Sequence, residues 1–465
     1  EHGLSPNDVS TIFGASGAAK WLAIAGLDKA IFGDWMTGRT NATPVNLYGT
    51  SVGAFKLAAA ARRNPTQALA TLAQAYIAQS YSDAQTPNII ASETRKTLIK
   101  FLGNGADDIS QGVSEILTSP HYHLHIGAVR AHGLLNSDRR SGKIMALTHG
   151  FLRSAGGRNA LHDMAERAVF SDLRSNLRFE ARDGFPVYHC RLTEQNFYDA
   201  LRASGTIPVY MQPVHFAEDP RHSYLDGGLL DYHPVPGSFW PTTDGIVLYP
   251  HFYDHFKIRW FDKFAPWAKA GSHLLQNVVM IAPNANFVRA LPDAKLPTRQ
   301  DFTKYRRRED VRFDKWQTIV RQSDVLGERF LELCKTGDIA AHVNSNRLSY
   351  AELPFRPEQL AEMVQLIDGG KISGKIAKEI LPELLEKGGS PKAIVDERGL
   401  GMISDPAAIE AIVDELLGAH PDEVEAFRGG KTKLQGFFVG QLMKKTGGKA
   451  DPKLANQILS KKLKG

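Results

Sequence analysis

The chain has 465 residues, of which 43% are hydrophobic and 23% are charged, and its formal net charge is +6. This composition excludes a chain that is mainly disordered, collagenous or coiled coil, and +6 is too small by itself to indicate a nucleic-acid partner. The two cysteines, Cys190 and Cys334, cannot form a disulfide framework, which favours a reducing compartment.

Membrane and export signals are not visible in the sequence. No stretch approaches the roughly 18 consecutive apolar residues that cross a bilayer, so we expect no transmembrane segment. The sequence opens without a basic region followed by an apolar stretch, so we expect no signal peptide. These features predict a cytoplasmic protein that meets membranes only peripherally.

Up to about residue 335, short apolar runs alternate with helical patterns. Residues 45–48 and 245–249 have the length and composition of strands, whereas residues 54–61 and 66–79 have the pattern of helices. Strands that alternate with helices are typical of α/β proteins with a largely parallel sheet. We therefore predict this fold class for the first part of the chain.

The first motif in chain order is a loop of small residues, Gly14-Ala15-Ser16-Gly17, between a predicted strand and a predicted helix. Backbone N–H groups in such a loop can point at an anion. The loop fits a tight turn, an oxyanion hole for a nearby nucleophile or a phosphate-binding loop. The Walker pattern of a phosphate-binding loop is absent.

The strongest motif is Gly49-Thr50-Ser51-Val52-Gly53, which follows the predicted strand 45–48 and opens an Ala-rich helix. A strand, a tight turn and a helix form the setting of a nucleophile elbow. Gly49 and Gly53 would allow the sharp turn, and the helix N-terminus would stabilise negative charge. Ser51 is therefore the candidate nucleophile.

Three alternating histidines, His121, His123 and His125, would share one face of a strand. Three imidazoles could bind zinc, but no Asp, Glu or Cys lies nearby as an obvious fourth ligand. An ordinary strand face is the simpler interpretation, and we expect no metal.

A candidate acid lies in Tyr224-Leu225-Asp226-Gly227-Gly228. An Asp before two glycines is commonly a turn, and it can equally place a carboxylate beside a nucleophile. Asp183-Gly184 is a rival acid that lacks the second small residue.

Residues 252–267 contain seven aromatic side chains in sixteen residues, with Lys and Arg among them. Aromatic and basic residues together suit a lipid–water interface. A half-buried segment that covers an active site would have the same composition, and we favour that interpretation.

After about residue 336 the strand patterns end. Residues 360–367 have apolar side chains at helical spacing, and Asp405-Pro406 is a typical helix start. Residues 337–427 hold 8 basic and 17 acidic residues, whereas residues 428–465 hold 10 and 1. This change of texture and charge indicates a separate all-α module.

The three motifs of the first part together resemble the patatin-like phospholipase family. That family has a glycine-rich oxyanion loop, then Gly-x-Ser-x-Gly, then Asp-Gly-Gly or Asp-Gly-Ala, and the chain has them in this order with 175 residues from Ser51 to Asp226. The loop departs from the family, because Ala15 and Ser16 replace glycines. The resemblance implies a three-layer α/β hydrolase that cleaves lipid or phospholipid esters without a cofactor.

The same resemblance implies the roles of the site residues. Asp226 would take the proton of Ser51, which would attack the ester and form an acyl-serine intermediate. Backbone N–H groups of the loop Gly14–Gly17 would form the oxyanion hole. A Ser-His-Asp triad on another hydrolase fold stays open, because His233, His251, His255 and His273 all follow Asp226.

The last part resembles the tail domain of the aspartyl/glutamyl-tRNA amidotransferase B subunit. The matching stretches are residues 372–378, 436–444 and 448–452. The resemblance implies a helical domain that contacts tRNA, here through the basic residues 428–465. The catalytic region of that family is not visible in the sequence.

We therefore predict two domains: a patatin-like serine acyl hydrolase in residues 1–335, and a helical amidotransferase-B-type tail in residues 336–465. The predicted activity is that of a phospholipase A or lysophospholipase. The alternatives are a tRNA-binding accessory or fusion protein with an inactive hydrolase domain, and a triad esterase.

Overall fold

The structure is a computed structural model that divides into two compact units, Leu4–Thr336 and Gly337–Gly465. The described residues are 4–81, 86–103, 108–154, 161–241, 244–264, 270–336, 357–401, 406–429, 434–446, 450 and 452–464. We call the first unit the hydrolase unit and the second the tail unit. The assignment of activities to residues 1–335 and 336–465 stays a prediction.

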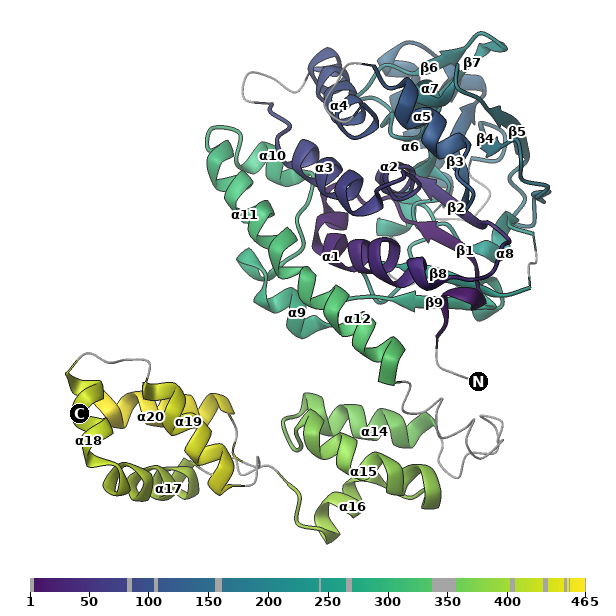
Figure 1. Ribbon diagram of the computed structural model, residues 1–465. Coiled ribbons are helices and arrows are strands. Elements are labelled where there is room, and N and C mark those ends of the chain that lie inside the picture. Colours follow the sequence, from purple (N-terminus) through teal and green to yellow (C-terminus); the bar gives the residue numbers. More distant parts are fainter. Residues whose placement is uncertain are drawn as a thin grey trace. The chain divides into compact units, whose positions relative to one another are not determined.

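The hydrolase unit is built on a nine-stranded mixed sheet in which strands β5-β4-β3-β2-β1-β8-β9 lie side by side (Figure 1). The pairs β1–β2, β2–β3, β1–β8, β4–β5 and β8–β9 are parallel. The strands are β1 (Val9–Gly14), β2 (Val45–Thr50), β3 (Tyr122–Ala131), β4 (Ala165–Asp172), β5 (Val187–Leu192), β6 (Val214–Phe216), β7 (Asp219–Asp226), β8 (Ile246–Pro250) and β9 (Val278–Ile281).

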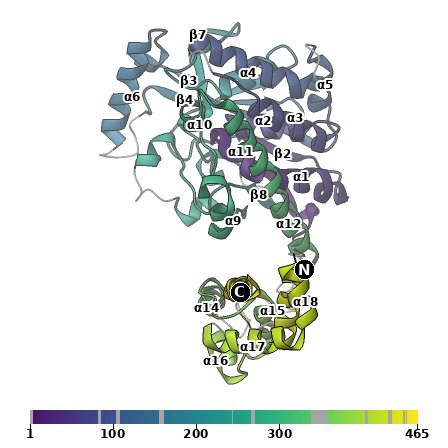
Figure 2. The same cartoon turned by 90° about the vertical axis from the view of Figure 1, so that its left-hand side faces the viewer.

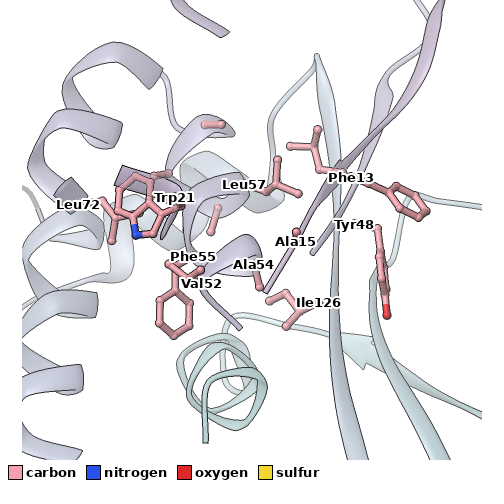
Figure 3. Packing of buried hydrophobic residues seen from close by; sticks show 14 of the residues in the cluster. Phe13, Ala15, Trp21, Tyr48, Val52, Ala54, Phe55, Leu57, Leu72 and Ile126 are labelled. Carbon is pink, nitrogen blue, oxygen red and sulfur yellow. The ribbon is translucent and has the colours of Figure 1, made fainter. Parts of the chain in front are cut away.

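Helices cover both faces of this sheet, which gives the predicted three-layer α/β fold. Figure 3 shows side chains of α2 between Trp21 and Leu72 on one side and Phe13 and Tyr48 of the sheet on the other. The helices are α1 (Ala25–Lys29), α2 (Val52–Ala60), α3 (Pro65–Ile77), α4 (Pro87–Leu102), α5 (Ser110–Leu117), α6 (Arg140–Ser154), α7 (Phe197–Ser204), α8 (Pro236–Phe239), α9 (Ala285–Ala290), α10 (Gln300–Lys304), α11 (Glu309–Gln322) and α12 (Asp324–Thr336). On the opposite face, Trp240 after α8 packs edge-on against Phe13.

The longest strand, β3, brings distant parts of the chain together. β4 pairs with one edge of β3 over His125–Ala131. β2 and β7 must share the other edge: β2 runs parallel and ends with Thr50 opposite Gly127, and β7 runs antiparallel and ends with Asp226 opposite Ala128. The carboxyl ends of β2 and β7 therefore meet head to head.

The elements predicted from the sequence are confirmed with small shifts of their ends. The strand predicted at 45–48 is β2, the strand predicted at 245–249 is β8, and the two predicted helices are α2 and α3. His125 is buried in β3 and its Nε2 lies 3.1 Å from Asn46 Oδ1. Over the described ranges, no group of three or more His, Cys, Asp or Glu could hold a metal ion.

The described part of the tail unit is helical. Its helices are α14 (Pro357–Asp368), α15 (Gly374–Lys387), α16 (Pro391–Glu397), α17 (Pro406–Ala419), α18 (Pro421–Arg428), α19 (Leu434–Lys445) and α20 (Pro452–Lys464). The first three share one hydrophobic cluster and the last four share another. The predicted N-cap Asp405 lies outside the described residues. Among the helices that the structure describes, none is long and apolar enough to span a membrane.

Candidate active site

Ser51 occupies the turn between β2 and α2, as predicted for a nucleophile elbow. Its backbone has φ 53° and ψ −130°, a conformation that L-residues rarely adopt. A Cβ on Gly49 would lie 2.5 Å from the Gly53 carbonyl carbon, and one on Gly53 would lie 2.2 Å from the Gly14 carbonyl oxygen. Only glycines allow β1, β2 and α2 to approach this closely, so they fix the position of Ser51.

Ser51 and Asp226 are in direct contact. The Ser51 hydroxyl donates a hydrogen bond of 2.8 Å to Asp226 Oδ2. The other carboxylate oxygen, Oδ1, accepts from the Gly228 amide at 2.7 Å, and a side chain on Gly228 would collide with Asp226 and Ser16. Because Asp226 is held by the turn that follows it, its Oδ2 is directed at the serine.

A third residue, Ser204 at the end of α7, anchors the turn that carries the nucleophile. The Ser51 amide donates to Ser204 Oγ at 2.9 Å, and Ser204 Oγ donates to the Gly127 carbonyl at 2.6 Å. Ser204 is fully buried. Nothing in the sequence indicated this role, because the partners of Ser204, the Ser51 amide and the Gly127 carbonyl, lie far from it along the chain.

Two adjoining cavities open beside Ser51, and they share Ala18, Ser51, Ile207, Tyr210 and Arg299. The first, which we call the dyad cavity, has a volume of about 250 Å³. It is lined by Ser16, Gly17, Ala18, Lys20, Ser51, Leu147, Ile207, Pro208, Val209, Tyr210, Asp226, Gly228, Leu229, Tyr232, Trp260 and Arg299.

The second cavity, which we call the side cavity, has a volume of about 320 Å³. Its lining includes the aromatic residues Phe55, Tyr76, Tyr81 and Phe302. Phe302 belongs to α10, which lies beside α11 and far from the dyad in the sequence (Figure 2). Together the cavities offer a mostly apolar space on either side of the nucleophile.

The oxyanion hole at Gly14–Gly17 stays a prediction, and the structure shows Ser16 and Gly17 of this loop in the wall of the dyad cavity. The Ser16 amide donates to the Tyr232 carbonyl at 2.9 Å, so this N–H is already engaged within the fold. Gly14 and Ala15 do not line either cavity, because their carbonyls face the elbow at Gly53. Gly17 lines the dyad cavity with Ser51, and so does its neighbour Ala18, which the sequence did not single out.

Lys20 also lines the dyad cavity. Its Nζ lies 3.4 Å from the Gly17 carbonyl and 3.4 Å from the Tyr232 hydroxyl. Burial lowers the pKa of Lys20 from its usual value to about 8, and the nearby positive charge of Arg299 adds to this effect. Lys20 is therefore a cation that loses its proton at a lower pH than an exposed lysine does.

Neither of the rival groups reaches Ser51. The Asp183 carboxylate is bound by Arg167 at 2.9 Å. None of the four candidate histidines lines the dyad cavity or the side cavity. His251 is fully buried, which lowers its pKa to about 3 and makes the ring a poor base. The geometry disfavours a triad.

The aromatic segment 252–267 forms part of the cavity wall in its described portion. Phe252, Phe256 and Phe261 are buried, and Trp260 lines the dyad cavity. This arrangement favours the interpretation of the segment as a cover. Residues 265–267 lie outside the described part.

Strained residues gather at the site. Among the described residues, six other than glycine have a positive φ, and three of them, Ala18, Ser51 and Val209, line the dyad cavity. Val209 is the most unusual, because a β-branched side chain rarely adopts φ 73°. Strain of this kind persists where the surrounding structure holds it, which is typical of functional sites.

Comparisons with known proteins agree with the two-part organisation. Residues 14–237 match the family model described as patatin-like phospholipase, and residues 327–463 match the model described as GatB domain. The first match supports a lipid hydrolase. The second match ends at residue 463, one residue before the end of α20.

The tail is similar to the B subunits of aspartyl/glutamyl-tRNA(Asn/Gln) amidotransferases. It is 98% identical over 129 residues to the protein of Synechococcus sp. (strain CC9605), and 91% identical over 129 residues to that of Prochlorococcus marinus (strain MIT 9303). Each match covers 28% of this chain and 26% of the relative. The chain thus spans about a quarter of the length of these relatives.

Two solved structures resemble the chain weakly. VipD from Legionella pneumophila has a TM-score of 0.28 and 10% identity over 98% of this chain and 88% of that chain. The type III effector protein ExoU has a TM-score of 0.24 and 12% identity over 89% and 81%. Similarity this low says nothing about activity. The family models, in contrast, confirm the resemblance that the motifs predicted: a patatin-like phospholipase segment followed by a segment of the amidotransferase B subunit.

Proposed function

We propose that the protein is a lipid acyl hydrolase of the phospholipase A or lysophospholipase type, with Ser51 as nucleophile and Asp226 as its base. The observation that carries this proposal is the 2.8 Å hydrogen bond from Ser51 Oγ to Asp226 Oδ2 inside a largely apolar cavity. A carboxylate that accepts the serine proton is already in place for attack on an ester.

In this mechanism Ser51 attacks the ester carbonyl while its proton passes to Asp226. The amides of Gly17 and Ala18 are the best-placed donors for the tetrahedral oxyanion, since both residues line the cavity beside Ser51. Asp226 then protonates the departing alcohol and leaves an acyl-Ser51 ester. Water, deprotonated by Asp226, attacks that ester, and Asp226 returns the proton to the departing Ser51 oxygen as the fatty acid is released.

A lipid surface as partner is supported by helix α6, which contributes one residue to the wall of the dyad cavity. Leu147 of α6 lines the cavity, and the same helix exposes Ile144, Met145 and Phe151, which are 45%, 59% and 44% exposed. Arg140 is also exposed at the start of α6. Apolar and basic side chains on one helix suit peripheral contact with a membrane.

The test is hydrolysis of micellar phospholipid by the parent protein, Ser51→Ala and Asp226→Asn, with fluorophosphonate labelling of Ser51. We expect both variants to lose hydrolysis and Ser51→Ala to lose labelling. Asp183→Asn is the matched control, because Asp183 is the rival acid and should be dispensable for turnover. Equal labelling of the parent and Ser51→Ala would contradict the assignment.

A second proposal is that the tail contacts tRNA, which the identity of 98% over 129 residues to an amidotransferase B subunit favours. Lys444, Lys445 and Lys461 are exposed in α19 and α20. The proposal is tested by a gel shift of the full chain with tRNA at low ionic strength. A shift that does not weaken with salt would contradict phosphate contact.

A further inference from the structure

Two cations border the dyad cavity, and one of them lies outside the segment that matches the phospholipase family. Lys20 and Arg299 both line the cavity with Ser51, and Arg299 also lines the side cavity. The family match ends at residue 237, so it does not include Arg299. Asp226 is the single carboxylate among the described lining residues of the two cavities.

Arg299 is placed at the point where the two cavities adjoin. Its guanidinium lies over the ring of Tyr210, 4.4 Å from the ring centroid, and Tyr210 is 45% exposed. Within the part of the chain that the structure describes, Arg299 forms no ion pair. Its neighbour Asp301 is buried and accepts from the Thr298 amide at 2.9 Å, and its negative charge partly offsets the effect of Arg299 on Lys20. Arg299 is thus an exposed residue that stacks on Tyr210 and lines both cavities.

The two cations would favour an anion between them. Arg299 and Lys20 repel each other strongly enough that the positive charge of Arg299 contributes to the lowered pKa of Lys20. An anion bound in the dyad cavity would remove that repulsion. A guanidinium offers two parallel N–H donors to phosphate oxygens, and an ammonium binds phosphate as a point charge.

We propose that Arg299, together with Lys20, binds the phosphate of a phospholipid ester while the ester carbonyl lies at Ser51. This inference rests on the proposed function and deepens it, because it names the substrate class as phosphate-bearing esters and excludes neutral glycerides as the preferred substrates. The acyl chain and the head group would then occupy the two adjoining cavities, with the phosphate near their junction at Arg299.

The test compares lysophosphatidylglycerol with the monoacylglycerol of the same acyl chain in the same detergent micelles. These substrates carry the same acyl ester and differ in the phosphoglycerol head group, which supplies the phosphate. We expect Arg299→Gln to lower the ratio of kcat/KM for the two substrates about 10- to 100-fold, mainly through KM. Arg299→Lys should recover part of the loss, because it keeps the charge without the paired donors. Arg307→Gln, an exposed arginine on the same segment, is the matched control.

An unchanged ratio in Arg299→Gln would overturn the inference even if the parent hydrolyses both esters. Failure of the proposed function looks different: the parent would hydrolyse neither ester and Ser51 would not be labelled. The phosphate site is then still tested by calorimetry. The affinity of dihexanoyl phosphatidylglycerol is measured for the Ser51→Ala variant and for the double variant Ser51→Ala with Arg299→Gln. Equal affinities would overturn the inference, and inorganic phosphate binding as tightly as the lipid would overturn the assignment to a head group.

Discussion

The hydrolase unit contains a buried ion pair between two helices, whereas an ion pair between two helices of the tail unit is exposed to water. In the hydrolase unit, Lys56 of α2 pairs with Asp28 of α1 at 2.7 Å, and the two side chains are only 2% and 0% exposed. In the tail unit, Lys462 of α20 pairs with Asp414 of α17 at 2.6 Å, and these side chains are 23% and 57% exposed. Both pairs join two helices, but only the first is shielded from water.

This difference shows what holds each unit in its arrangement. A buried ion pair is costly to form and is destabilising when one partner is lost, so it specifies how α1 and α2 lie against each other. α2 is the helix that follows Ser51. An exposed pair contributes little to stability and leaves the surface free for contacts. Backbone strain also differs between the two units. The described residues other than glycine that have a positive φ all lie in the hydrolase unit, whereas the positive-φ residues described in the tail unit are all glycines.

The largest expected effect would come from Asp226→Asn, which keeps the shape of the side chain and removes the base. We expect phospholipid hydrolysis to fall about 10³- to 10⁵-fold, measured as initial rates with circular dichroism as the control for folding. Substitution of an exposed tail residue such as Lys444→Gln should leave the rate unchanged. A residual rate within tenfold of the parent would mean that another group acts as base.

The comparison of ion pairs predicts a large effect on stability. Lys56→Met leaves Asp28 buried without its partner and should lower the free energy of unfolding by about 3–5 kcal/mol, measured by urea denaturation of the full chain. Lys462→Met should leave the unfolding midpoints nearly unchanged. The double variant Asp28→Leu with Lys56→Met should recover most of the loss, because it removes both charges.

If both lysine variants shift their unfolding transitions equally, the contrast between buried and exposed pairs fails. If the double variant is as unstable as Lys56→Met, lost packing rather than the unpaired carboxylate is the cause.

The exposed apolar side chains of α6 predict a smaller effect that depends on the substrate surface. Met145→Glu removes an exposed apolar side chain and adds a negative charge, which should weaken contact with anionic vesicles by about 1–2 kcal/mol. Vesicle hydrolysis should then fall about 5- to 30-fold, while hydrolysis of a soluble ester should change little. Leu173→Glu is the control, because Leu173 is 60% exposed but does not belong to α6, the helix whose Leu147 lines the dyad cavity. Equal losses in the two variants would place the contact elsewhere.

The lowered pKa of Lys20 predicts a pH dependence of selectivity. Lys20 is cationic below about pH 8 and neutral above it, so the preference for phospholipid over monoacylglycerol should fall as the pH rises through that value. The groups that act on it are Arg299, Asp301 and the Tyr232 hydroxyl, whose own pKa burial raises. Lys20→Met should show a flat profile in the ratio of kcat/KM. A profile that keeps its step in this variant would assign the titration to another group.

The smallest effect concerns the tail unit. Lys461→Glu should weaken the affinity for tRNA in a salt-sensitive gel shift by a fewfold. The slope of log K against log salt should fall by the amount expected for about one phosphate contact. Lys462→Glu should also disturb the pairs with Glu410 and Asp414. A stronger loss in Lys461→Glu than in Ser51→Ala would separate RNA contact from hydrolysis, and equal shifts for all variants would contradict the proposed contact.

Those parts of the site that depend on residues adjacent in the sequence could be predicted from the sequence. The elbow at Ser51 needs a strand, two glycines and a helix within a short stretch, and the turn that holds Asp226 is likewise local. The hydrogen bond from the Ser16 amide to the Tyr232 carbonyl could not be predicted, because Tyr232 lies far along the chain. Arg299 carries no motif, and its position near Ser51 follows only from how α10 and α11 pack. The pairing of Asp28 with Lys56 also required the fold.

The cavity walls combine residues of the segment that matches the phospholipase family with residues from beyond it, among them Trp260. The nucleophile, its base and their supporting bonds lie before residue 237, whereas Arg299, Gln300, Phe302 and Thr303 are contributed from beyond it. Random mutation can therefore alter these later residues without disturbing the hydrogen bonds that hold Ser51. For directed evolution, a library confined to the exposed residues Arg299, Gln300 and Thr303 would search substrate preference without touching the buried Asp301 and Phe302.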